Sequence, residues 1–205
     1  MKSKKIKTLV LLAFFSTIMV ILANTPLGYV PIGPINATTL HIPVILAGIL
    51  LGKKNGAIIG FVFGLTSFLR STFYPGPASF IFTPFYSVGN VSGNFYSLLI
   101  AFGPRLLLGY LSGLTFEKLK INNVSVKIAI VALMNTLIHT ALVLMMVYIF
   151  FTKEYAAVLN VSVSGLKAAL LAVIGTNGIM EAILALFVCV AVYKATHKIV
   201  ERMMK

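Results

Sequence analysis

Long apolar stretches separated by short polar connections make up most of this 205-residue chain. Stretches of this kind and length are typical of membrane-spanning helices. We therefore expect an all-α membrane protein, with residues 1–205 forming one integral membrane domain of six transmembrane helices. The expected helices cover residues 8–23, 39–51, 56–69, 96–116, 126–151 and 166–193.

Two of the expected helices, 39–51 and 56–69, are short for a bilayer. About thirteen residues cover roughly 20 Å at 1.5 Å per residue, less than the hydrocarbon layer of about 30 Å. We expect their outer ends to meet protein or a water-filled cavity, because non-helical backbone at membrane depth is tolerated only there. The last helix carries GTNG at residues 175–178, and two glycines around two polar residues predict an interruption in mid-membrane.

Two connections are rich in proline and almost free of charge. Residues 24–38 are punctuated by Pro and Gly, which predicts an ordered external loop. Residues 70–94 resemble a lid, since their aromatic rings need a place to bury and the outer mouth of the helix bundle provides one. Glycines four residues apart indicate close helix packing, namely Gly48, Gly52, Gly56, Gly60 and Gly64, with Gly109 and Gly113 in the fourth helix.

The distribution of charge predicts the orientation. Of the 17 Lys and Arg residues, 13 fall on the two ends of the chain and on alternate connections. The positive-inside rule then places both termini in the cytoplasm. Hydrophobic residues at 59% and charged ones at 10% exclude a soluble domain. The formal charge of +13 is explained by anionic lipid and topology, so we expect no nucleic-acid partner.

Several classes of catalytic site are missing from the sequence. Residues 48–54 contain Gly-x-x-x-Gly-Lys-Lys, which lacks the spacing and the Ser/Thr of a phosphate-binding loop. The chain has no aspartate, no His-Glu-x-x-His and no Gly-x-Ser-x-Gly, so intramembrane proteolysis lacks its residues. Cys189 is the one cysteine, which excludes a disulfide framework and a cysteine metal site. We expect no enzyme activity, no metal and no cofactor.

Two ionisable residues lie inside apolar helices. Arg105 lies about 13 Å along the fourth helix from its outer end, and Glu181 lies in the sixth helix, on one face with Asn177. Intramembrane charges mark functional sites or pair with one another. Two interpretations therefore stay open: an Arg105–Glu181 ion pair, or a ligand carboxylate bound by Arg105 while Glu181 orients the ligand.

Other polar residues are expected near the same mouth. Asn135 and His139 lie four residues apart on the fifth helix, where interhelical hydrogen bonding is the simpler account of Asn135. The first connection supplies polar residues and the second supplies amides, although any of these could only cap a helix. The predicted binding set is Asn36, Thr38, His41, Asn90, Asn94, Arg105, His139, Asn177 and Glu181.

Five segments together resemble a known family. They are residues 31–45 (PIGPINATTLHIPVI), 51–57 (LGKKNGA), 60–67 (GFVFGLTS), 103–105 (GPR) and 177–181 (NGIME). They resemble the substrate-binding S component of energy-coupling factor (ECF) vitamin transporters over essentially the full length. The first segment looks most like the pantothenate type.

The resemblance implies a six-helix subunit of the bacterial cell membrane that captures a vitamin, here pantothenate, at the outer side. A transmembrane coupling subunit and two cytosolic ATPases would supply the energy, and the subunit would topple in the membrane to release its cargo. In the family, small residues four apart near the start of the first helix mark the docking face. This chain has Ala13 and Thr17 there, so the second alanine is missing.

Other functions remain open at this point. The vitamin could be riboflavin or another one. A self-sufficient secondary carrier would transport without partners, and a membrane-embedded enzyme would use His139 or His41 with Glu181.

Overall fold

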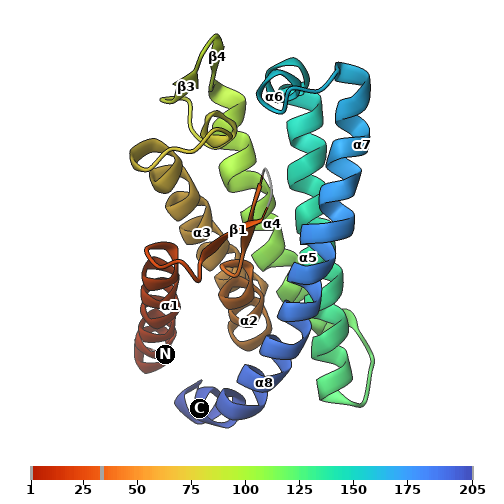
Figure 1. The fold of residues 1–205 in the computed structure, drawn as a ribbon. Helices are drawn as coiled ribbons and strands as arrows, with labels where there is room; N and C mark the ends of the chain where they lie inside the picture. The colour runs from red at the N-terminus through yellow and green to blue at the C-terminus, as the bar shows by residue number, and fades with distance from the viewer. Residues whose placement is uncertain (1, 33–34, 205) are drawn as a thin grey trace.

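The computed structural model describes residues 2–32 and 35–204, which are mostly helical (Figure 1). The main helices are α1 (Lys2–Ala23), α2 (His41–Leu51), α3 (Lys53–Phe73), α4 (Phe95–Lys118), α5 (Val124–Phe150), α7 (Val163–Val173) and α8 (Ile179–Met204). The smaller elements are the antiparallel hairpins β1 (Tyr29–Ile32) with β2 (Ile35–Thr38) and β3 (Ser87–Val88) with β4 (Val91–Ser92), the 3-10 turn η1 (Ser79–Ile81), α6 (Thr152–Val158) and the π-helical turn η2 (Ile174–Gly178).

Five helical segments among the described residues are long and apolar enough to cross a membrane. They are Lys5–Ala23, Lys53–Phe73, Phe95–Lys118, Val124–Phe150 and Val163–Met203. The predicted all-α membrane protein is confirmed at this level. α2 is apolar and 11 residues long, and all of its residues except Leu50 are buried. It therefore contacts other helices, as expected for a helix too short to span the bilayer.

The predicted length of the third helix is wrong. α3 has 21 residues and continues past Leu69 to Phe73. Arg70 does not end the helix, because a cation is favourable in the last turn. Its Nη1 also donates to the carbonyl oxygen of Ala23 at 3.2 Å, which satisfies an acceptor at the end of α1.

Glycines bring α2, α3 and α4 into backbone contact. A Cβ atom added at Gly48 would lie 2.7 Å from the carbonyl oxygen of Gly109, and one added at Gly64 would lie 2.8 Å from that of Ala101. These separations are too short for any side chain, so the predicted small-residue packing is confirmed. Gly52 instead turns the chain between α2 and α3 with a φ of 87°, which favours glycine.

The first connection contains a hairpin that reaches the interior. Tyr29 of β1 pairs with Thr38 of β2, and each of the two residues also contacts a helix. The Tyr29 hydroxyl lies 3.2 Å from Ser67 Oγ on α3, and the Thr38 amide donates to Glu181 Oε1 on α8 at 2.6 Å. Figure 1 draws this hairpin among the helices rather than beyond their ends.

The second connection covers the bundle only in part. Phe80 and Ile81 of η1 are buried in a cluster with Phe151 and Tyr155. Other rings expected to bury are exposed, namely Phe73, Tyr74 and Phe85. Both ends of the chain and the α4–α5 connection lie at one end of the molecule, while β3–β4 and α6 lie at the other (Figure 1).

The last predicted helix is two helices joined by η2, at the GTNG sequence where an interruption was expected. It also extends further than predicted, from Val163 to Met204. α1 likewise begins at Lys2 rather than residue 8. Apolar stretches mark the membrane-embedded part of a helix, whereas the charged turns at Lys2–Lys7 and after Tyr193 continue it into the polar region.

Candidate functional site

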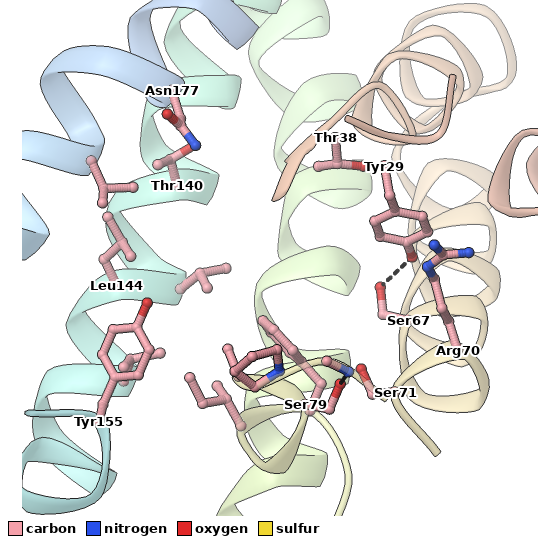
Figure 2. Close-up of a pocket in the computed structure, with 18 of the residues that line it drawn as sticks. Tyr29, Thr38, Ser67, Arg70, Ser71, Ser79, Thr140, Leu144, Tyr155 and Asn177 are labelled. Atoms are coloured by element: carbon pink, nitrogen blue, oxygen red, sulfur yellow. Dashed lines mark hydrogen bonds between the residues drawn. The ribbon is translucent and has the colours of Figure 1, made fainter. Parts of the chain in front are cut away.

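A cavity of about 570 Å³ lies between α3, α4, α5 and α8. We call the end lined by η1 and α6 its outer part and the end lined by Arg105 and Glu181 its inner part. Figure 2 shows Asn177, Thr140, Leu144 and Tyr155 along one wall and Tyr29, Ser67, Arg70 and Ser71 on the opposite one. The predicted residues that line it are Thr38, Arg105, His139, Asn177 and Glu181. The sequence therefore indicated five of the polar residues that line the cavity.

Arg105 is held by a carbonyl that its own helix leaves free. Pro104 has no amide hydrogen, so the Ile100 carbonyl loses its usual partner four residues later. Arg105 Nη1 donates to that oxygen at 2.6 Å. The guanidinium also lies over two rings, 5.3 Å from the centroid of Phe63 and 4.9 Å from that of Phe82.

These contacts fix the Arg105 guanidinium at the cavity without neutralising it. The side chain is 6% exposed, and its Nε has no hydrogen-bond partner among the described residues. A desolvated cation with donors to spare binds an anion strongly, because a charge-assisted hydrogen bond is about twice as strong as a neutral one.

Glu181 connects the hairpin to the helices. Its Oε1 accepts from the Thr38 amide at 2.6 Å, and its Oε2 accepts from the Thr140 hydroxyl at 3.4 Å. Within residues 2–32 and 35–204, the ion pair closer than 4.0 Å joins Lys53 to Glu117, at 2.8 Å. Arg105 and Glu181 thus line the same cavity without a direct ion pair. The carboxyl oxygens of Glu181 accept from a backbone amide and a hydroxyl instead of from the Arg105 guanidinium.

His139 and Asn177 complete the inner part of the cavity. The His139 ring lies 5.9 Å from the ring of Phe63, which also faces Arg105. The Nε2 atom of His139 is buried and has no hydrogen-bond partner in the described part of the chain. Asn177 is buried in η2, where α8 approaches α5 so closely that a Cβ at Gly178 would lie 3.3 Å from Thr140. The π-helical turn therefore brings the Asn177 amide to the cavity.

The wall formed by α3 and β1 was missed. Ser67, Arg70 and Ser71 line the cavity with Tyr29, and the Arg70 guanidinium lies 4.7 Å from the centre of the Tyr29 ring. Their spacing of three and four residues marks one face of a helix, a signal present in the sequence. It was overlooked because the helix was expected to end at residue 69.

The outer part of the cavity is lined mainly by apolar side chains, and the hydroxyls beside them include those of Ser79, which accepts from the Gly76 amide at 2.9 Å, and of Tyr155. Val147, Val158, Leu159 and Ile81 line it together with Tyr155 of α6. The helix α6 was not predicted, and burial raises the pKa of the Tyr155 hydroxyl to about 12. This hydroxyl is therefore a neutral hydrogen-bond donor near neutral pH.

Four predicted binding residues are not among those that line the cavity. His41 is fully buried at the start of α2, and neither ring nitrogen has a hydrogen-bond partner among the described residues. Asn94 caps α4 by accepting from the Tyr96 amide at 2.8 Å, and Asn90 is exposed in the β3–β4 turn. Asn36 belongs to β2, but its side chain lies outside the described part of the structure.

Two other residues singled out in the sequence lie elsewhere. Asn135 donates to Thr115 Oγ1 of α4 at 2.9 Å, which confirms interhelical hydrogen bonding as its role in the fold. Ala13 and Thr17 lie on the exposed face of α1, opposite the buried Leu11 and Phe15. They are therefore accessible from the membrane.

Comparison with known proteins agrees with this arrangement. The family described as "ECF transporter, substrate-specific component" matches residues 7–193. The pantothenic acid transporter PanT of Lactococcus lactis subsp. cremoris is 35% identical over 201 residues, covering 97% of each chain. The pantothenate transporter PanT of Leuconostoc mesenteroides subsp. mesenteroides is 28% identical over 211 residues, covering 98% of each. With a family match over most of its length and a relative aligned almost end to end, this multi-pass membrane protein belongs to the substrate-specific components of ECF transporters.

Proposed function

We propose that this chain binds pantothenate in the cavity at Arg105 and delivers it to the energy-coupling part of an ECF importer. The observation that carries the proposal is the buried Arg105 side chain, which lines the cavity and forms no ion pair among the described residues. Pantothenate is a small carboxylate with hydroxyls and an amide, and two relatives that align over nearly the whole chain are named as transporters of it.

In the proposed complex the Arg105 guanidinium binds the ligand carboxylate. Arg70 adds a second guanidinium to the lining, so two cations and one carboxylate surround the ligand. His139, Asn177 and Thr140 offer the neutral groups that a ligand amide and hydroxyls require. Each carboxyl oxygen of Glu181 accepts one hydrogen bond, from Thr38 or Thr140, and keeps a further lone pair for the ligand.

Binding to the purified chain tests this function. Titration calorimetry of the chain alone should give saturable, one-to-one binding of pantothenate and none of riboflavin. Proteoliposomes with this chain alone should take up no pantothenate. Failure to bind pantothenate would overturn the proposal. Binding of riboflavin instead would identify riboflavin as the substrate. Uptake driven by an ion gradient in the chain alone would identify a secondary carrier instead.

The proposed transporter crosses the membrane six times with both termini in the cytoplasm. Support comes from the positive-inside distribution and from the two chain ends that lie at one end of the molecule (Figure 1). In a Cys189→Ser background, a membrane-impermeant maleimide should label Asn90→Cys in intact cells and Lys120→Cys only after permeabilisation. The reverse pattern would invert the orientation and place the β3–β4 end in the cytoplasm.

The energy would come from partners. We propose that a transmembrane coupling subunit and two cytosolic ATPases act with this chain, which topples in the membrane to release pantothenate inside. The exposed small residues of α1 support a docking face there, because small side chains allow close helix approach.

A further inference from the structure

The outer part of the cavity contains a hydroxyl that the fold does not need. Tyr155 is fully buried in α6, and its hydroxyl has no hydrogen-bond partner among the described residues. Leaving a buried hydroxyl unpaired costs roughly 1–3 kcal/mol. Its ring packs in a cluster with Phe80 and Phe151, whose centroids are 5.5 Å apart. A phenylalanine would fill the same space at lower free energy, so packing alone gives no reason for the hydroxyl.

The position of Tyr155 separates it from the charged part of the cavity. His139, Thr140, Val143, Leu144 and Val147 line the cavity from α5, and eight residues of helix place the ends of this stretch about 12 Å apart. The His139 end is polar, since the Phe63 ring there faces both His139 and Arg105. The Val147 end joins the apolar cluster that contains Tyr155.

This gradient of polarity matches the chemistry of pantothenate. One end of that molecule is a carboxylate. The other end is a branched carbon with two methyl groups and a terminal hydroxymethyl group. The methyl groups require an apolar wall, and the hydroxyl beside them requires one hydrogen-bond partner within it. Val147, Val158 and Leu159 provide such a wall, and Tyr155 provides the partner.

We propose that Tyr155 contacts the substrate and fixes its orientation, binding the terminal hydroxyl at the outer end while the carboxylate lies at Arg105. Figure 2 shows the Tyr155 hydroxyl on the cavity side of its wall, directed toward Leu144 and Thr140. The inference rests on pantothenate as the ligand. It assigns a specificity role to α6, which has a single buried polar side chain, that of Tyr155.

A pair of ligands tests the contact. Tyr155→Phe should lower the affinity of the purified chain for pantothenate about 3- to 10-fold, the range of one neutral hydrogen bond. The same substitution should leave the affinity for 4′-deoxypantothenate, which lacks the terminal hydroxyl, unchanged or higher. Tyr110→Phe is the matched control, because Tyr110 is 38% exposed on α4 and does not line the cavity. Its affinity for both ligands should equal that of the wild type.

A second comparison tests the orientation. An analogue with a carboxamide in place of the carboxylate should keep the Tyr155→Phe effect and lose most of the Arg105→Gln effect. If the Tyr155→Phe effect disappears with the carboxamide instead, the ligand is bound the other way round and the proposal is overturned.

The remaining outcomes are also decisive. Equal losses with pantothenate and its deoxy analogue would reduce Tyr155 to a packing role, and unchanged pantothenate affinity in a folded Tyr155→Phe variant would remove it from the site. Either result leaves the proposed function intact. A wild-type chain that binds no pantothenate overturns both proposals together.

Discussion

The guanidinium of Arg105 depends on its neighbour in sequence. Pro104 removes an amide hydrogen, the Ile100 carbonyl is left without its helical partner, and Arg105 donates to that oxygen at 2.6 Å. Cation–π contacts with the rings of Phe63 and Phe82 hold the same group. A costly intramembrane cation is therefore oriented by contacts that leave its charge available to an anion.

Replacing this side chain should affect binding far more than folding. Arg105→Gln should lower pantothenate affinity about 10- to 100-fold, because a hydrogen bond to a charged group contributes roughly 1.5–3 kcal/mol. Calorimetry on the purified variant measures the loss. Arg202→Gln is the control, since Arg202 is an exposed guanidinium near the end of α8. A folded Arg105→Gln variant with unchanged affinity would contradict the assigned role.

Among the predicted binding residues, those that line the cavity were mostly the ones whose chemistry is unusual for their position. A charge or an amide in an apolar helix is unusual, and Arg105, His139, Asn177 and Glu181 were identified for that reason. Tyr155 offered no such contrast, because an aromatic residue in an apolar stretch is ordinary. Its importance depends on burial and on an unpaired hydroxyl, which are properties of the packed structure.

At the scale of the element, α4 combines a proline in its interior with unusually close packing. Gly109 faces Gly56 so closely that neither position has room for a Cβ, and the backbone of Arg105 lies against Gly60. The helix therefore cannot shift sideways to compensate for a change at Pro104. Any change in its hydrogen bonding should appear in the orientation of Arg105.

Substitution of the proline should separate helix stability from binding. Pro104→Ala restores an amide that bonds to the Ile100 carbonyl and competes with Arg105 for it, so pantothenate affinity should fall about 2- to 10-fold. Thermal stability should stay equal or rise, because proline is about 3 kcal/mol less favourable than alanine inside a helix. Paired calorimetry and thermal unfolding measure the two effects. A variant that loses stability and affinity together would show that the kink itself supports the fold.

Element boundaries were less predictable than element identity. The apolar stretches predicted the helices correctly, but they predicted the end of α3 at residue 69. The helix continues because Arg70 is compatible with its last turn, and the Arg70 side chain donates to the end of α1. The β1–β2 hairpin was missed because Pro31 and Pro34 argue against strands. Its position depends on long-range contacts, such as that of Thr38 with Glu181, which local sequence does not encode.

At the scale of the molecule, the cavity joins parts of the chain that are far apart in sequence. Glu181 bonds to Thr38, which lies 143 residues away, and Ser67 meets Tyr29 across 38. The walls from α3 and β1 face those from α5, α6 and η2 across the cavity (Figure 2). The residues that line the cavity therefore come from distant parts of the fold, whereas the exposed face of α1 contributes none of them.

This separation allows docking and binding to be tested independently. Ala13→Trp adds bulk on the exposed face of α1, outside the cavity, and should block close helix approach by the coupling subunit. Pantothenate affinity of the isolated chain should not change. Uptake by proteoliposomes that also contain the coupling subunit and ATPases should fall at least tenfold.

Ala172→Trp is the matched control on α7, at the opposite side of the bundle (Figure 1), and should support normal uptake. Uptake that survives Ala13→Trp would exclude this face of α1 from docking, and equal losses in both variants would attribute the effect to bulk in the bilayer rather than to an interface.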